Sequence, residues 1–177
     1  MKIIVNLNKE MRCFPEAITT VDKKLITSKN NIKQWIYLCL QSVFSKTRLN
    51  EIKHIIIDIN FVNRDTMIEY NNNFRGINNI TNVLSFANNV LIKDGYDVNM
   101  DIAFISLGEM VLCCEKILEE AQEYNKTFIE RYTHIFIHSI LHLLGYDHID
   151  EKERIKMEQL EETILYQLGI HNPYSIL

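Results

Sequence analysis

The stretch TFIERYTHIFIHSILHLLG, residues Thr127 to Gly145, decides the fold of the C-terminal third of the chain. Thr127 is followed three residues later by Glu130, and this capping box is typical of the first turn of a helix. Apolar residues then recur every three or four positions, which is the period of a helix with a buried face. Gly145 suits the left-handed backbone at which many helices end. The stretch therefore predicts a helix that begins at Thr127 and ends at Gly145.

The rest of the chain alternates between the patterns of strands and helices. Four segments have the apolar or alternating pattern of strands, namely residues 3–7, 54–61, 83–86 and 102–113. Three more have helical spacing or capping residues, namely 32–44, 64–74 and 150–168. We predict a single α+β domain over residues 1–177, with one four-stranded mixed sheet packed by helices and a helical C-terminal third. A polar, glycine-containing stretch at about 88–101 is predicted to be a hairpin-like loop excursion.

The composition restricts the class of protein. A chain of 177 residues can bury about 70% of its unfolded surface, which suffices for one core and not for two. No apolar run approaches the length of a membrane span, and polar residues interrupt the first twelve positions before a signal peptide could form. Four cysteines lack metal-finger spacing and are predicted to be buried reduced thiols. We therefore expect a cytoplasmic protein with no membrane partner.

Charge is divided unevenly along the chain. The first 75 residues carry 12 Lys/Arg and 7 Asp/Glu, whereas residues 76–177 carry 7 and 16, and the formal net charge is −4. This balance argues against indiscriminate binding of polyanions but is compatible with one local basic surface.

Three histidines lie near the end of the predicted helix: His138, His142 and His148. Residues four apart on a helix differ by only about 40° in azimuth, so His138 and His142 project side by side. The reversal expected at Gly145 can bring His148 back toward them. Three imidazoles leave a fourth position for water, which predicts a catalytic site for Zn²⁺ or a related metal. The alternative interpretation is that these histidines are packed in the core and bind no metal.

The same spacing occurs in metzincin proteases, whose general-base Glu directly follows the first histidine. Ser139 occupies that position here. A metal at this site therefore serves a different hydrolysis, or the base comes from elsewhere in the chain.

Residues 138–148 resemble the signature H-G-x-L-H-L-x-G-Y-D-H of the YbeY family of metal-dependent endoribonucleases, and only Ser139 departs from it. The resemblance extends over most of the chain from about residue 50. It includes Asn71-x-x-Phe74-Arg75, the run TNVLSF at 81–86, LGEM at 107–110, EAQ at 120–122, His134, Leu168-Gly169 and Pro173-Tyr174.

The resemblance implies a single-strand-specific endoribonuclease that acts in ribosomal RNA processing, including 16S rRNA 3′-end maturation, and in ribosome quality control. It implies His138, His142 and His148 as metal ligands for one Zn²⁺ per chain, and Arg75 and His138 as catalytic residues. Arg75 is also expected to bind the substrate, because a guanidinium can hold two phosphate oxygens. His134 is a candidate substrate contact, with a buried structural role as the alternative. The implied partners are ribosomal RNA and the small ribosomal subunit.

Two departures from the family pattern concern the site. Ser139 adds a hydroxyl beside the first predicted ligand, and Glu109 is one methylene longer than the usual Asp. Asp147 is predicted either to orient a histidine ring or to stabilise a turn.

Two other functions remain as alternatives: another zinc-dependent hydrolase, or a ribosome assembly factor with a minor catalytic role. The sequence identifies neither a general base nor an oligomeric state.

Overall fold

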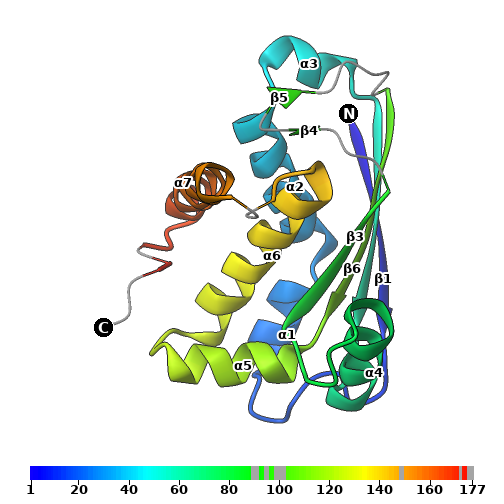
Figure 1. Cartoon of the computed structure of the whole chain (residues 1–177), viewed down its shortest axis with the longest axis vertical. Coiled ribbons are helices and arrows are strands. Elements are labelled where there is room, and N and C mark those ends of the chain that lie inside the picture. Colours follow the sequence, from blue (N-terminus) through cyan, green and yellow to red (C-terminus); the bar gives the residue numbers. More distant parts are fainter. Residues whose placement is uncertain (89–91, 94–95, 98–102, 148–149, 172, 175–177) are drawn as a thin grey trace.

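The computed structural model describes residues 1–88, 92–93, 96–97, 103–147, 150–171 and 173–174 (Figure 1). Its elements, in chain order, are β1 (Lys2–Lys9), α1 (Thr20–Ile26), α2 (Lys29–Val43), α3 (Lys46–Glu51), β2 (His54–Phe61), α4 (Arg64–Arg75), β3 (Val83–Ala87), β4 (Ile92–Lys93), β5 (Tyr96–Asp97), β6 (Phe104–Leu112), α5 (Cys114–Glu123), α6 (Phe128–Leu144) and α7 (Glu151–Gln167).

The main sheet has four strands in the order β1-β2-β6-β3. β1, β2 and β6 run parallel, with Ile3 beside Ile55 and Ile55 beside Ile105. β3 joins the edge of the sheet antiparallel to β6. The prediction of an α+β domain with one mixed four-stranded sheet is therefore confirmed.

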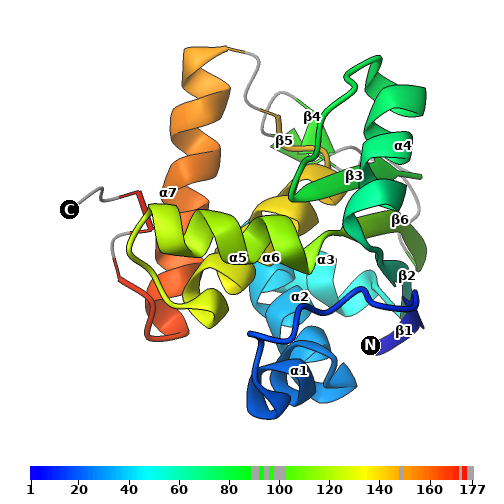
Figure 2. The ribbon, with the colours of Figure 1, turned by 90° about the horizontal axis from the view of Figure 1, so that it is seen from below.

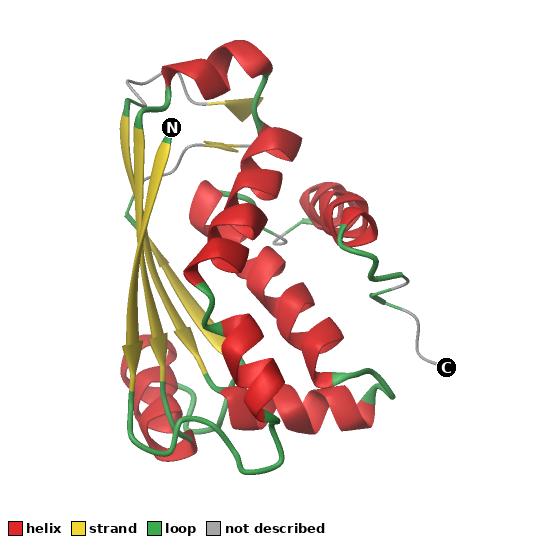
Figure 3. Cartoon of the chain, turned by 180° about the vertical axis from the view of Figure 1, so that it is seen from behind, coloured by secondary structure: helices red, strands yellow, loops and turns green. Residues whose placement is uncertain are grey.

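Most of the helices cover one face of this sheet (Figure 3). Alternate residues of β2 are buried, from Ile55 to Phe61, and belong to the same apolar cluster as the buried side chains of α2 and α6. Trp35 of α2 lies 5.2 Å from Phe136 of α6, measured between ring centroids. Helix α6 lies between the sheet and α7 (Figure 2), which explains why it is apolar on nearly all sides.

Helix α4 packs on the opposite face of the sheet. Met110 and Leu112 of β6 belong to the large core, whereas Val111 belongs to a second, smaller cluster. Successive residues of a strand point to opposite faces, so this second cluster lies on the other side. It contains Met67 of α4 and Leu84 of β3. The end of α4 lies near the edge strand β3, because the rings of Phe74 and Phe86 are 4.8 Å apart between centroids.

The capping signals read from the sequence are confirmed. Thr127 and Glu130 form both hydrogen bonds of a capping box at the start of α6. Gly145 ends that helix with a φ of 106°, in the left-handed region. Asp150 accepts a hydrogen bond from the backbone N–H of Glu153 and begins α7.

Three helices were not predicted from the sequence, namely α1, α3 and α5. The first two are short, and Cys113, the N-cap residue of α5, forms no side-chain cap hydrogen bond, so α5 lacks the capping signal that marked the predicted helices. The predicted excursion at 88–101 contains the antiparallel pair β4 and β5, and most of the rest of it lies outside the described residues.

All four cysteines are free and buried, as expected. Within the described part of the chain, no helix has the length and apolar character of a membrane span.

Candidate functional site

Two of the three predicted metal ligands meet on the last turns of α6. The Nε2 atoms of His138 and His142 are 3.0 Å apart, and their rings are nearly perpendicular at 82°. Two nitrogens bound tetrahedrally to one Zn²⁺ at about 2.0–2.1 Å would stand about 3.3–3.4 Å apart. The pair therefore has nearly the separation that a single metal ion requires.

The hydrogen bonds of the other ring nitrogens fix where the protons are. His142 Nδ1 lies 2.9 Å from the backbone carbonyl of Tyr146, which can only accept, so Nδ1 donates. His138 Nδ1 lies 2.7 Å from a carboxylate oxygen of Glu161 and donates likewise. In the neutral rings both Nε2 atoms then carry lone pairs, and these lone pairs face each other. A proton on one of the two rings would relieve this repulsion as an N–H···N hydrogen bond, and so would a metal ion bound to both Nε2 atoms.

Glu161 of α7 is the buried partner of this pair, with only 1% of its surface exposed. Burial by itself raises the pKa of a carboxyl group. Here hydrogen bonds from His134 and His138 outweigh burial and, with a hydrogen bond from the Tyr174 hydroxyl, hold the pKa of Glu161 at about 2. The carboxylate is therefore ionised and acts as an acceptor at neutral pH.

The histidine pair opens into a cleft of about 510 Å³. Arg75 lies at its rim, at the exposed end of α4, and β3 forms a wall. Among the described residues, the lining comprises Arg75, residues 81–85, Ala87, His138, His142, Gly145, Tyr146 and Asp147. Arg75, predicted from the sequence, thus shares one cleft with His138 and His142. It is also the one described lining residue that comes from the more basic first 75 positions.

The other predicted site residues have different positions. His148 lies outside the described residues, and within those residues no group of three metal-ligating side chains is found, so the three-histidine set stays a prediction. His134 is 7% exposed, and its Nε2 donates to Glu161 at 3.0 Å. It lines a second pocket of about 330 Å³ together with His138. Glu109 accepts a hydrogen bond from Asn60 on the sheet.

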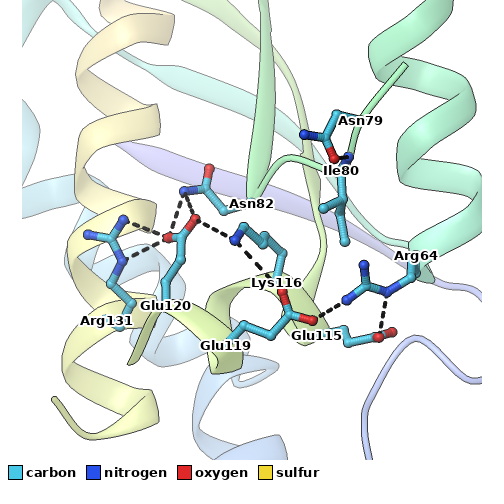
Figure 4. Close-up of polar contacts among 9 residues, drawn as sticks. All are labelled: Arg64, Asn79, Ile80, Asn82, Glu115, Lys116, Glu119, Glu120 and Arg131. Carbon is cyan, nitrogen blue, oxygen red and sulfur yellow. Dashed lines mark hydrogen bonds and ion pairs between the residues drawn. The ribbon is translucent and has the colours of Figure 1, made fainter. Parts of the chain in front are cut away.

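A polar network joins Asn82, the residue before β3, to α5 and α6 (Figure 4). Glu120 accepts hydrogen bonds from Asn82 at 2.9 and 3.2 Å and from Arg131 at 2.6 and 3.0 Å. Lys116 adds an ion pair at 4.0 Å. Asn82 lines both pockets, so the network connects the cleft wall to the helix that carries the histidines.

Sequence reasoning missed Glu161 and Arg131. Glu161 had a detectable signal, because it occupies an apolar position of α7 among Met157, Ile164 and Leu165, which are all buried. An acidic residue on a buried face needs partners, and the histidines supply them. Arg131 has no such signal in the sequence.

A histidine pair whose Nε2 atoms converge, in one cleft with an arginine, is the arrangement expected of the class of metal-dependent hydrolases that act on anionic substrates. The comparisons with known proteins are more specific. The family model described as Endoribonuclease YbeY matches residues 17–169. The chain therefore belongs to the YbeY family of endoribonucleases.

Individual relatives agree with this assignment. The chain is 34% identical to the Endoribonuclease YbeY of Colwellia psychrerythraea over 95% of its length and 96% of the relative. It is 40% identical to that of Francisella tularensis subsp. tularensis over 77% of both chains. The solution structure of TM1509 from Thermotoga maritima has the same fold, with a TM-score of 0.50 and 23% identity over 94% of this chain and 92% of that one.

Proposed function

We propose that this protein is a metal-dependent endoribonuclease whose metal is held by His138, His142 and His148. The observation that carries the proposal is the convergence of the two histidine Nε2 atoms at 3.0 Å, inside the cleft that Arg75 also lines. Family membership supports RNA as the substrate. Three imidazoles suit Zn²⁺, and we propose one zinc ion per chain.

When bound, the metal supplies a Lewis acid that activates water or polarises a phosphoryl oxygen. Arg75 then orients the scissile phosphodiester, because its planar guanidinium can hold two phosphate oxygens and offset the charge that develops on them. His138 contributes to catalysis as one of the ligands that would hold the metal. Asp147 and Ser85 line the same cleft, where the Asp147 carboxylate can accept a hydrogen bond from a ribose hydroxyl and the Ser85 hydroxyl can donate one to a phosphate oxygen.

In the cell we propose that the substrate is single-stranded ribosomal RNA of the small subunit. The reaction would be 16S rRNA 3′-end maturation and the removal of defective ribosomes, in the cytoplasm. Among the described residues that line the cleft, Arg75 is the one Arg or Lys, which fits the recognition of a few phosphates better than the binding of a long duplex.

Elemental analysis and RNA cleavage test the proposal together. The wild-type protein should contain about one zinc per chain and cleave a single-stranded RNA, and His142→Ala should lose both. Arg75→Ala should keep the zinc and lose about 10²–10³-fold in cleavage rate, as expected when a transition-state contact is removed. Lys24→Ala, an exposed cation on α1, is the control and should retain full activity.

Two results would overturn the proposal. One is the absence of metal from wild-type protein prepared with metal present. The other is unchanged RNA cleavage by the metal-free His142→Ala variant.

A further inference from the structure

We propose that Glu161 is a positioning residue of the metal centre: it holds His138 in the one orientation and tautomer that present Nε2 to the metal. This inference rests on the proposed function and adds a residue to it from outside the cleft lining. Glu161 reaches the site from α7, 23 residues along the chain from His138.

The two carboxylate oxygens of Glu161 have separate partners. Oε1 accepts from His138 Nδ1 at 2.7 Å, while Oε2 accepts from His134 Nε2 at 3.0 Å and from the hydroxyl of Tyr174. Oε2 is thus held by two donors from two other segments. Oε1 is thereby fixed in place as the acceptor for the ring of His138.

His134 is itself held from behind. The guanidinium of Arg131 points at His134 Nδ1 from 3.4 Å and can only donate, so His134 carries its proton on Nε2, toward Glu161. Arg131 is fixed in turn by Glu120, which also binds Asn82 of the cleft wall (Figure 4). The acceptor for His138 is therefore anchored through a continuous set of hydrogen bonds.

A purely structural role explains this arrangement less well. Burying a carboxylate costs free energy, and an apolar residue would dock α7 on α6 without that cost, as Met157, Ile164 and Leu165 do on the same face. What a carboxylate adds is a strong acceptor for an imidazole N–H. Partners of this kind fix the tautomer of a metal-binding histidine and raise its basicity.

Glu161→Gln is the informative substitution. Glutamine offers one oxygen in place of two, so an amide N–H must face either His138 or His134. A His138 ring that meets this N–H moves its own proton to Nε2, the atom that faces His142, and then cannot bind a metal there. A His138 ring that keeps its tautomer loses the negative charge of the Glu161 carboxylate, which makes its Nε2 atom more basic.

The test measures Zn²⁺ affinity by competition with a chelator. Glu161→Gln should bind Zn²⁺ about 10–100-fold more weakly than wild type, the range seen when such partners are removed. Glu161→Asp should recover part of the loss. Glu162→Gln, the same change at the next and exposed position of α7, should bind as wild type does. Unfolding in chelator confirms that each variant folds without metal.

Equal Zn²⁺ affinity of wild type and Glu161→Gln overturns the inference and leaves the proposed function intact. Absence of Zn²⁺ binding by wild type overturns both. If Glu161→Gln does not fold, nitrogen-detected NMR of the metal-free wild-type protein decides. A His138 ring protonated on Nδ1 supports the inference, and one protonated on Nε2 overturns it.

Discussion

Replacing Ser139 by alanine should stabilise the protein. Ser139 stands where the YbeY family signature has glycine, and it is 0% exposed in the middle of α6. Its Oγ has no hydrogen-bond partner among the described residues. A buried hydroxyl left unpaired costs about 1–3 kcal/mol, and alanine is the better helix former by up to about 0.7 kcal/mol.

The magnitude can be worked out from these two contributions. Loss of the hydroxyl leaves a small void, and at roughly 24 cal/mol per Å³ this void lowers the gain in stability by a few tenths of a kcal/mol. The net gain is about 1–3 kcal/mol, or about 2–12 °C in Tm for a domain of this size. Ser139→Gly should be about 1 kcal/mol less stable than Ser139→Ala, because glycine is the poorer helix former.

Urea and thermal unfolding of the metal-free protein measure this effect. Ser42→Ala is the matched control, because the hydroxyl of Ser42 in α2 does donate, to the carbonyl of Leu38 at 3.0 Å. That variant should gain nothing from relief of an unpaired group. If Ser139→Ala is less stable than wild type by 1 kcal/mol or more, roughly the worth of one hydrogen bond, then Oγ is paired in solution and the reasoning is refuted.

Two further substitutions test the pairing of β6 with β3 and the start of α6. Gly108→Ala should cost at least about 2 kcal/mol, since its Cβ would lie 2.0 Å from the carbonyl oxygen of Phe86 and its φ is +119°. Gly76→Ala should cost less, because a Cβ at Gly76 meets open space. Equal losses in the free energy of unfolding of the two variants, measured in urea, would contradict the clash. Thr127→Ala should cost about 1 kcal/mol by removing the N-cap. The Thr127 side chain and backbone lower the pKa of Glu130, so that part of the stability is present above the ordinary Glu pKa and is lost as pH falls through the lowered value. The loss in free energy of unfolding caused by Thr127→Ala should therefore become smaller in acid. A loss that stays constant across that pH range would show that Glu130 does not contribute.

The sequence determined the parts of this protein that depend on neighbours within a few residues. The start of α6 at Thr127, its end at Gly145 and the side-by-side placement of His138 and His142 all follow from helix geometry and capping. The four strands were predicted because a half-buried strand alternates with period two. The short helices α1 and α3 and the uncapped α5 were not predicted, although Thr19 and Ser45 cap the first two.

Only the tertiary structure decided which distant segments meet. The position of α4 on the far face of the sheet brings Arg75 to the cleft, and the docking of α7 on α6 brings Glu161 to His138. No local pattern specifies these contacts, because they depend on how apolar faces pack across the whole core. The proton position on His138 follows from its packed partner Glu161, whereas that on His142 follows from the nearby carbonyl of Tyr146. The helix therefore sets the spacing of the histidine pair, and the fold sets its chemistry.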